Sequence, residues 1–374
     1  MESETSSLSK HKPFYPPVNR DLVKVLVDFI KQETSRFDIK KCVIGLSGGI
    51  DSAVSAYLAV QALGKRNVLA ILLPYKQSSP ESIRDALTIV KDLGIKSRII
   101  NVTGPVDALL EANKKIDKVR KGNIIARMRM ICLYDMSNEF KGLVLGTSNK
   151  TEMLLGYSTI FGDAASAINP LGDLYKTQIW QLAKLLKIPP KIIKKKPSAD
   201  LWTGQSDEGE LGFTYKDVDE LLYFMIDQRY PDSELIEAGF KKEFIKRVKH
   251  LIARNQFKRL PPIIAKVSNR TVNVDFRYNR DWRYDLKEIR FNDSTYQVLT
   301  NMDFTGYEKD FNPKYYEILR LVPAMLVSPG QTSFLVIGKN CMNKDPKEKE
   351  CREFINLPAL PGIIQVFSLQ KAEK

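Results

Sequence analysis

The first half of the chain alternates between two patterns of apolar residues. Short, continuous apolar runs are typical of strands buried on both faces, and they cover 42–46, 68–73, 98–102 and 142–146. Stretches with helical spacing lie between them, at 51–63, 79–93 and 122–138. This alternation predicts right-handed βαβ units, and therefore a doubly wound α/β fold in which helices cover both faces of a parallel sheet.

Sheets of this kind bind ligands beyond the C-terminal ends of their strands. Three segments directly follow a predicted strand, and they begin at Ser47, Pro74 and Thr147. The C-terminal ends of neighbouring parallel strands share one edge of the sheet. We therefore expect a ligand site to draw on these three segments.

The composition changes twice along the chain. Residues 1–17 are mostly polar and contain three prolines, which predicts a flexible tail. From Asp281 onward 13 basic residues balance 13 acidic ones, so the whole net charge of +14 lies before it. We place the main domain at 18–282 and a small α+β C-terminal extension at 283–374, with a predicted hairpin between 321 and 338.

The residue inventory excludes several kinds of chemistry. Only two histidines occur, His11 and His250, which argues against a histidine-rich metal site or a Ser-His-Asp triad. The four cysteines form no CxxC pair, which favours a reducing compartment and a cytoplasmic protein. No apolar run is long enough for a membrane span. The basic charge suits polyphosphate ligands or nucleic acid, and charge alone does not separate the two.

The strongest motif is an octet between the first predicted strand and the following helix. It reads Gly45, Leu46, Ser47, Gly48, Gly49, Ile50, Asp51 and Ser52. Glycines let the backbone approach an anion, and the loop amides and helix N-terminus supply partial positive charge. The octet is not a GxxxxGK[ST] loop. A carboxylate beside an anion site calls for a cation, so Asp51 is a candidate Mg²⁺ ligand.

A series of motifs follows the octet at characteristic spacing. They are Gly146–Glu152, Gly156–Tyr157, Phe161–Asp163, Asn169–Leu171, Tyr175–Lys176, Lys196–Leu201, Gln205, Asp207–Glu208 and Leu211–Gly212. Together with Gly122–Arg127 and Lys258–Pro262, this order resembles the ammonia-dependent NAD synthetases, which belong to the N-type ATP pyrophosphatases with an SGGxDS loop. The resemblance covers about residues 12–275.

The resemblance implies a five-stranded sheet of the adenine nucleotide alpha hydrolase type and a set of site residues. ATP would be held by Gly45–Ser52, Thr147, Lys176 and Ser198, and Mg²⁺ by Asp51 and Glu152. Asp51 and Lys176 would be catalytic, and Arg127, Phe257 and Lys258 would contact the dinucleotide. The sequence departs from the family pattern at three positions, where Ile160, Ala167 and Phe257 replace a lysine, an aspartate and a histidine.

The same resemblance implies the reaction. The pyridine carboxylate of deamido-NAD would be adenylated by ATP and then amidated by ammonia, giving NAD, AMP and pyrophosphate. Asp173, Asp207 and Glu208 are alternative bases for ammonium, and 197–212 is a predicted lid because serine, glycine and aspartate favour a loop. The family is homodimeric, and the nitrogen donor would be free ammonia or a separate glutaminase subunit.

Two other functions compete with this interpretation. A tRNA-modifying enzyme would use the same ATP loop and would suit the basic charge. Such enzymes usually have catalytic cysteines, whereas Cys42 and Cys132 fall in a predicted strand and in a helix stripe. A non-catalytic nucleotide-binding module is the second alternative, and retention of Asp51 and Glu152 argues against it. Nucleic acid is therefore the less favoured partner.

Overall fold

The computed structural model describes residues 18–36, 38–112, 115–202, 204–260 and 263–267, and the backbone of six strands further along. The tail predicted at 1–17 lies outside the described residues. The chain divides into two compact units, Met1–Arg277 and Tyr278–Lys374. The limits predicted for the main domain and the extension stay predictions.

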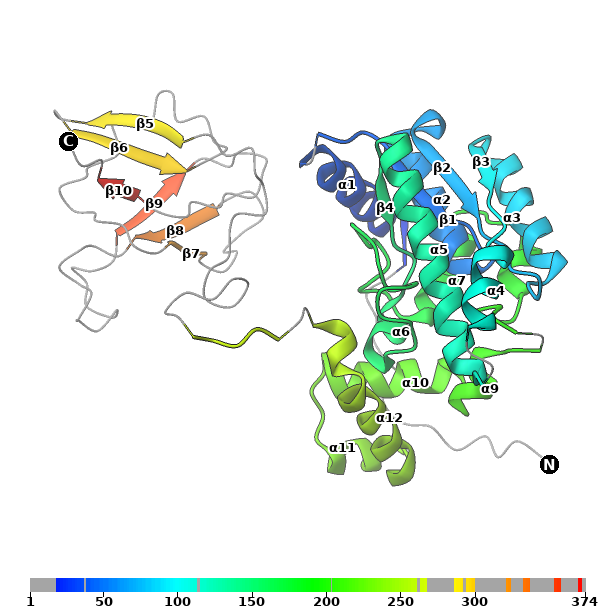
Figure 1. Ribbon diagram of the computed structural model, residues 1–374. Coiled ribbons are helices and arrows are strands. Elements are labelled where there is room, and N and C mark those ends of the chain that lie inside the picture. The colour runs from blue at the N-terminus through cyan, green and yellow to red at the C-terminus, as the bar shows by residue number, and fades with distance from the viewer. Residues whose placement is uncertain are drawn as a thin grey trace. The chain divides into compact units, whose positions relative to one another are not determined.

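The first unit is built on a parallel sheet (Figure 1). Its strands are β1 (Cys42–Gly45), β2 (Val68–Leu72), β3 (Lys96–Ile99) and β4 (Leu143–Leu145), in the order β3-β2-β1-β4. The order reverses beside β1, which is the switch point where sheets of this class bind ligands. The doubly wound α/β fold predicted from the alternating pattern is confirmed.

The predicted fifth strand is reduced to a single bridge, so the described sheet has four strands. Beyond β4 the chain returns parallel to it only at Ile168, which pairs with Leu145. Gly146 N–H donates to Ile168 O at 2.7 Å, and two residues later Pro170 has no N–H to extend a ladder.

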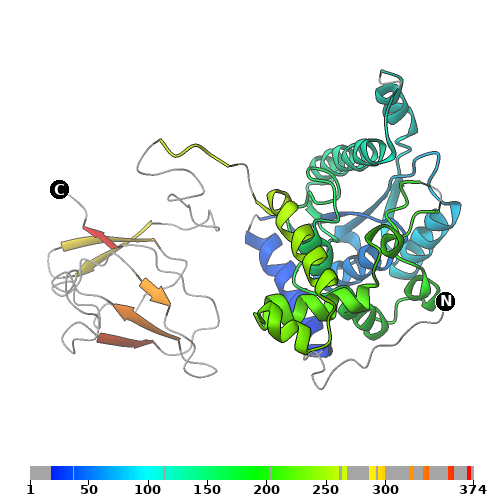
Figure 2. The same ribbon diagram turned by 90° about the horizontal axis from the view of Figure 1, so that it is seen from below.

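Alternate strand residues face opposite layers, as both faces of the sheet are buried. Cys42 and Ile44 of β1 pack with α1, α2 and α7, whereas Val43 packs with α4 and α5. Figures 1 and 2 show these two helical layers. The helices are α1 (Arg20–Arg36), α2 (Ile50–Leu63), α3 (Pro80–Leu93), α4 (Thr103–Glu111), α5 (Lys118–Phe140), α6 (Lys150–Leu155), α7 (Lys176–Leu185) and α8 (Pro190–Lys194). Short 3-10 turns occur at Lys65–Asn67 and Gln256–Arg259.

A second hydrophobic core follows in a helical subdomain. It comprises α9 (Asp207–Leu211), α10 (Tyr215–Leu222), a π-helical turn at Tyr223–Asp227, α11 (Asp232–Glu237) and α12 (Lys242–Arg254). Tyr175 and Tyr215 are fully buried in this core. Because Tyr175 immediately precedes α7, the subdomain packs directly beside the C-terminal edge of the sheet.

The helix boundaries follow local chemistry. Ser79 accepts a hydrogen bond from Glu81 N–H at the start of α3, and Gly94 ends that helix with φ 61°, as the sequence predicts. Helix α5 begins four residues before its predicted start because Asp117 caps it by accepting from Arg120 N–H. No helix in the described part of the chain is both long and apolar enough to cross a bilayer.

The second unit contains two antiparallel sheets. One pairs β10 (Leu369–Lys371), β6 (Ser294–Leu299) and β5 (Leu286–Phe291), and the other pairs β7 (Leu321–Pro323), β8 (Thr332–Val336) and β9 (Glu353–Leu357). β7 and β8 run antiparallel, as expected for the hairpin predicted between 321 and 338.

Candidate active site

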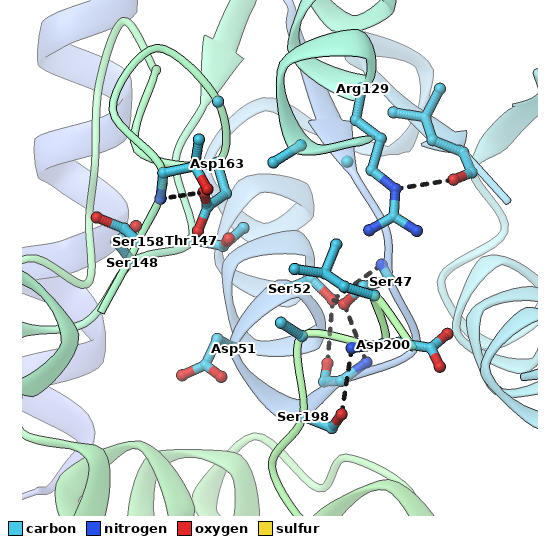
Figure 3. A pocket seen from close by; sticks show the side chains of 18 of the residues that line it. Ser47, Asp51, Ser52, Arg129, Thr147, Ser148, Ser158, Asp163, Ser198 and Asp200 are labelled. Atoms are coloured by element: carbon cyan, nitrogen blue, oxygen red, sulfur yellow. Dashed lines mark hydrogen bonds between the residues drawn. The ribbon is translucent and has the colours of Figure 1, made fainter. Parts of the chain in front are cut away.

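A pocket of about 660 Å³ opens at the C-terminal ends of β1, β2 and β4 (Figure 3). Its walls include all three segments that the strand-end rule points to, at Ser47, Pro74 and Thr147. The start of the predicted lid also contributes, with Ser198 and Asp200 among its lining residues. The sheet edge therefore carries one continuous site rather than three separate loops.

The glycine-rich loop is fixed by its own hydroxyls. Ser47 Oγ lies 3.1 Å from Ser52 Oγ, and Ser52 Oγ donates to Gly49 O at 3.0 Å. Gly49 N–H donates to Ser47 Oγ at 3.2 Å. Gly49 is also the N-cap residue of α2, which has no side-chain capping hydrogen bond. The loop thus holds an amide and two hydroxyls at a helix N-terminus, an arrangement that binds phosphate.

Gly48 is the position where this loop cannot carry a side chain. Its φ of +79° favours glycine, and a Cβ there would lie 2.2 Å from Ser82 O on α3. Every residue of the octet lines the pocket except Gly48, whose backbone packs against α3 instead. The loop is therefore seated on α3 with its remaining residues facing the pocket.

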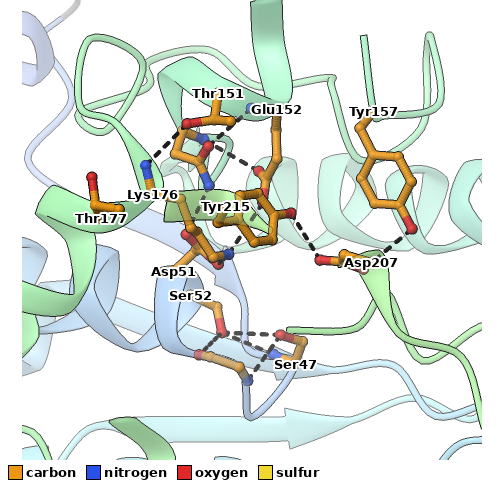
Figure 4. Close-up of polar contacts among 12 residues, drawn as sticks. Ser47, Asp51, Ser52, Thr151, Glu152, Tyr157, Lys176, Thr177, Asp207 and Tyr215 are labelled. Atoms are coloured by element: carbon orange, nitrogen blue, oxygen red, sulfur yellow. Dashed lines mark hydrogen bonds and ion pairs between the residues drawn. The ribbon is translucent and has the colours of Figure 1, made fainter. Parts of the chain in front are cut away.

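Next to the loop, one buried lysine bridges two carboxylates (Figure 4). Lys176 Nζ lies 2.5 Å from Asp51 Oδ2 and 3.3 Å from Glu152 Oε1. The lysine side chain is 2% exposed, whereas the two carboxylates keep 18% and 17% of their surface. The structure thus brings together Asp51, Glu152 and Lys176, three residues whose roles the family resemblance implies.

Asn149 fixes both carboxylates and was not assigned a role from the sequence. Its side-chain amide donates to Asp51 Oδ1 at 3.0 Å, while Asn149 and Glu152 form a capping box at the start of α6. Asn149 is fully buried. The N-x-x-E spacing of a capping box was the available signal, but it indicates only a helix start and not the contact with Asp51.

The acidic groups outnumber the cation that serves them. Burial, joined by the negative charges of Asp51 and Asp207, raises the pKa of Glu152 to about 8 against the opposing effect of Lys176. Burial alone would lower the pKa of Lys176, but Asp51 and Glu152 outweigh it and hold that pKa above its usual value. Lys176 therefore stays charged beside the two carboxyl groups.

A tyrosine-aspartate network supports this centre from the helical subdomain. Lys176 Nζ lies 5.1 Å from the centre of the Tyr215 ring, within cation–π range. Tyr215 Oη donates to Asp207 Oδ2 at 3.0 Å, and Tyr157 Oη donates to Asp207 Oδ1 at 3.2 Å (Figure 4). Of the three alternative bases for ammonium, only Asp207 lines the pocket.

The other two alternatives have different surroundings. Asp173 is 95% exposed and pairs with Lys150 at 3.1 Å. Glu208 accepts a hydrogen bond from Tyr215 N–H at 2.8 Å, which uses it as a helix-terminus contact. Neither lines the pocket.

Arg129 and Asp163 line the pocket and were not predicted as site residues. Arg129 Nε donates to Leu73 O at 3.0 Å and Nη2 donates to Ser78 Oγ at 3.1 Å, so the guanidinium is fixed at the end of β2 (Figure 3). Asp163 accepts from Thr159 N–H at 2.7 Å. Its enclosure by protein raises its pKa, although the side chain stays open to the pocket.

The remaining predicted site residues divide into two groups. Thr147, Ser198 and Lys258 line the pocket, and Lys258 Nζ donates to Gly156 O and Ser158 O, both at 2.7 Å. Arg127 and Phe257 do not line it and are exposed on the surface of this single chain. Their predicted contact with the dinucleotide is not made by the pocket that one chain forms.

The carboxylate oxygens of Asp51 and Glu152 suit a hard cation that takes its remaining ligands from substrate phosphates and water. Among the described residues, no three His, Cys, Asp or Glu side chains cluster closely enough to hold a metal alone. Asp51 and Glu152 supply carboxylate oxygens beside the phosphate-binding loop. Mg²⁺ is typically bound by one or two carboxylates plus substrate phosphates and water, so these two residues suit that ion.

A phosphate-binding loop at the switch point of a doubly wound sheet defines a nucleotide-binding α/β protein. The family model for NAD synthase matches residues 22–262. The chain belongs to the NAD synthase family. The match lies within the first unit and ends before the antiparallel strands of the second.

Individual relatives agree with this assignment. An NH(3)-dependent NAD(+) synthetase of Chlorobium phaeobacteroides (strain BS1) is 53% identical over 259 residues, covering 69% of this chain and 94% of that protein. A solved NH3-dependent NAD synthetase from Campylobacter jejuni is 36% identical with a TM-score of 0.57, covering 66% of this chain and 98% of that one. A structure of NMN synthetase from Francisella tularensis is 33% identical with a TM-score of 0.60, covering 68% and 100%.

Proposed function

We propose that this protein is an ammonia-dependent NAD synthetase, a ligase that forms a C–N bond. It adenylates the nicotinate carboxylate of deamido-NAD with ATP and amidates the product with ammonia. The observation that carries the proposal is the contact of Lys176 with both Asp51 and Glu152 directly beside the glycine-rich loop. This places one lysine and two carboxylates where the charge of a nucleotide's phosphates would lie.

In the first step, a carboxylate oxygen of deamido-NAD forms a bond with the α-phosphorus of ATP. The bond from that phosphorus to the bridging oxygen breaks, and its electron pair leaves with pyrophosphate. The amides of the loop, the N-terminus of α2 and the Lys176 ammonium neutralise the charge that grows on this leaving group. Most catalysis in such transfers comes from positioning and electrostatics.

Asp51 and Glu152 would hold Mg²⁺ in this reaction. The ion supplies Lewis-acid neutralisation of the phosphate oxygens when it is bound. Asn149 keeps the two carboxylates in place, because its side-chain amide donates to Asp51 Oδ1 and its backbone N–H donates to Glu152 Oε2. Lys176 stays between them as a fixed positive charge.

In the second step, the nitrogen lone pair of ammonia attacks the acyl carbon, and the bond from that carbon to the AMP oxygen breaks. AMP leaves with the electron pair, and the nitrogen loses a proton to give the amide. Asp207 is the alternative base that the pocket favours, since it lines the cavity and lies beside Tyr157 and Tyr215. No protein nucleophile takes part.

Water must be excluded because it would hydrolyse the acyl-adenylate. Residues 197–202 together with Gly204 and Gln205 line the pocket, so the predicted lid already forms one of its walls. We infer that this segment tightens over bound substrate. Limited proteolysis within 197–212 should slow when ATP, Mg²⁺ and deamido-NAD are added together, and unchanged cleavage would contradict the lid.

We infer that the enzyme acts as a cytoplasmic homodimer. Helix α5 exposes the apolar side chains of Val119, Ile131 and Tyr134, at 66%, 54% and 41%. Arg127 lies exposed on the same helix. A second subunit covering α5 would bury these side chains and bring Arg127 to an interface. Free ammonia, or ammonia released by a separate glutaminase subunit, would be the nitrogen donor.

One assay tests the whole proposal. The protein is incubated with ATP, Mg²⁺, ammonium and deamido-NAD, and NAD, AMP and pyrophosphate are measured by mass spectrometry. Equal amounts of NAD and AMP are expected, and neither should form without ammonium. AMP without NAD, or binding of tRNA that persists until high salt, would favour the alternative enzyme class.

The same assay should be repeated with nicotinate mononucleotide in place of deamido-NAD. The solved relative from Francisella tularensis is an NMN synthetase. At three positions of this chain, Ile160, Ala167 and Phe257 replace residue types that usually contact the dinucleotide. We expect a higher kcat/KM for deamido-NAD than for nicotinate mononucleotide, and the reverse order would reassign the substrate.

A further inference from the structure

Asp85 is a buried carboxylate that the reaction above does not use. It lies on α3 and is 2% exposed. Lys191 Nζ lies 2.9 Å from its Oδ1, and Lys195 Nζ lies 3.0 Å from its Oδ2. Burial would raise the pKa of Asp85, but the hydrogen bonds from Lys191 and Lys195 outweigh it and hold that pKa below its usual value. Asp85 thus binds two lysines, of which Lys191 lies in α8 and Lys195 directly follows that helix.

The two lysines differ in what else they touch. Lys191 is 60% exposed, and its second partner is Glu81 at 3.1 Å. Lys195 is 26% exposed, lines the pocket, and donates to Ser82 Oγ at 3.1 Å and to Gly48 O at 3.4 Å. Only Lys195 therefore connects α3 to the glycine-rich loop.

The contact with Gly48 O determines which way one peptide group faces. A peptide group is planar and trans, so the carbonyl of Gly48 and the N–H of Gly49 point in opposite directions. The carbonyl accepts from Lys195 at 3.4 Å, while the Gly49 N–H donates at 3.2 Å to Ser47 Oγ, whose residue lines the pocket. Both ends of this peptide are thus fixed.

Two glycines in succession leave this peptide without side chains that would resist a rotation. A flipped peptide would turn the carbonyl oxygen of Gly48 toward bound phosphates and remove the Gly49 amide from them. An oxygen facing an anion is repulsive, whereas an N–H in that place donates a charge-assisted hydrogen bond. The loop needs a restraint on this peptide in order to bind ATP.

We propose that Lys195 is a positioning residue that locks the Gly48–Gly49 peptide with its N–H toward the ATP phosphates, and that Asp85 holds Lys195 in place for this purpose. Lys195 acts through the loop backbone and not by contact with the reacting atoms. Because Lys195 lies two residues before the lid segment, it also joins the lid to the loop. The inference rests on the proposed ATP site.

The test compares Lys195→Met with Lys191→Met, which removes the other partner of Asp85 outside the pocket. Lys195→Met should raise KM for ATP and the inhibition constant of magnesium pyrophosphate about tenfold, the loss of one hydrogen bond to a charged group. KM for deamido-NAD should stay unchanged. Lys191→Met should leave all three constants within about twofold of the parent.

Equal increases in the two lysine variants would overturn the proposal, because they would mean that both lysines serve only to neutralise Asp85. An equal increase in KM for deamido-NAD would also overturn it, since that pattern indicates general disorder of the lid. Asp85→Asn is the second variant in case Lys195→Met does not fold. It retains both lysines, and an intermediate rise in KM for ATP is expected.

Titration calorimetry with magnesium ATP alone separates this inference from the function on which it rests. If the parent protein does not bind magnesium ATP, the proposed ATP site itself fails. If the parent binds it and Lys195→Met and Asp85→Asn bind it equally well, only the role of Lys195 is overturned.

Discussion

Lys176 Nζ lies 2.5 Å from Asp51 Oδ2, although 125 residues separate the two in the chain. Asp51 belongs to the first turn of α2, after β1, and Lys176 is the first residue of α7. The contact fixes the phosphate-binding loop to the start of α7, directly after Tyr175 of the second hydrophobic core. It also means that neither residue can be changed without leaving the other's charge without its nearest partner.

Replacing Lys176 should therefore affect stability as well as turnover. Lys176→Met removes the cation that contacts both Asp51 and Glu152, and removing one partner of a buried ion pair costs about 3 kcal/mol. The free energy of unfolding, measured with urea, should fall by that order, and a second change, Asp51→Asn, should restore part of it. Lys184→Met, on the exposed face of α7, is the control and should change it little. Equal losses in both single variants would contradict the role of Lys176.

Magnesium binding should release a proton from Glu152. Burial and its acidic neighbours raise the pKa of Glu152 to about 8, so the carboxyl is protonated at pH 7 in the metal-free protein. A metal ion must displace that proton, and apparent affinity should fall about tenfold per pH unit below 8. Calorimetry in two buffers of different ionisation heat should give about one proton released at pH 7 and almost none at pH 9.

Glu152→Gln is the matched variant for that measurement. It retains the shape of the side chain but has no proton to lose, so proton release should vanish and affinity should weaken at every pH. If the variant still releases a proton at pH 7, the proton comes from another group, and Asp207 is the first to examine because its pKa is also raised, chiefly by burial.

The sequence predicted the parts of the site that depend on local pattern. The strand, the glycine loop and the helix containing Asp51 follow one another within a single βαβ unit, so spacing alone indicates an anion site there. Ser79 and Gly94 marked the ends of α3 because caps have strong residue preferences. Lys176 and Glu152 entered only through family resemblance, since isolated lysines and glutamates are usually surface residues.

The site residues that were not predicted from the sequence lie there because of how far their side chains extend, which a sequence pattern does not reveal. Arg129 lies on α5, whose apolar spacing indicates a core or a seam between subunits, yet its long side chain extends to Leu73 O. Periodicity gives the face of a helix but not how far a flexible side chain travels. The predicted fifth strand is not formed as a full strand. The chain pairs with β4 only at Ile168, and Pro170 shortly after it cannot donate to a ladder.

Asp219 provides a test of stability against pH. It is fully buried and accepts from Thr151 Oγ1 at 2.5 Å and from Thr177 N–H at 2.8 Å. Burial raises its pKa to about 6, so the folded state binds this proton more tightly than the unfolded chain. Its stabilising contribution is complete below pH 3.8 and is lost as pH rises through 6.

Asp219→Asn cannot lose that proton. Relative to the parent protein, the variant should gain about 2 kcal/mol in unfolding free energy between pH 4 and pH 7, whatever the other groups contribute to both. Urea unfolding of both proteins at each pH measures this difference. A constant difference over the range would show that Asp219 titrates as an ordinary carboxyl.

Two glycines with almost the same φ angle allow the effect of backbone strain to be distinguished from the effect of a steric clash. Gly48 has φ +79° and Gly64 has φ +80°, but a Cβ at Gly64 would meet no atom within 4 Å, whereas one at Gly48 would lie 2.2 Å from Ser82 O. Gly64→Ala should cost about 1–3 kcal/mol of stability from backbone strain alone and leave KM for ATP unchanged.

Gly48→Ala adds a clash with backbone that cannot be relieved by rotating a side chain, so the loop must lift from α3. We expect a larger loss of stability and at least a tenfold rise in KM for ATP. Equal effects of the two substitutions on KM would mean that the seat of the loop on α3 does not matter for nucleotide binding.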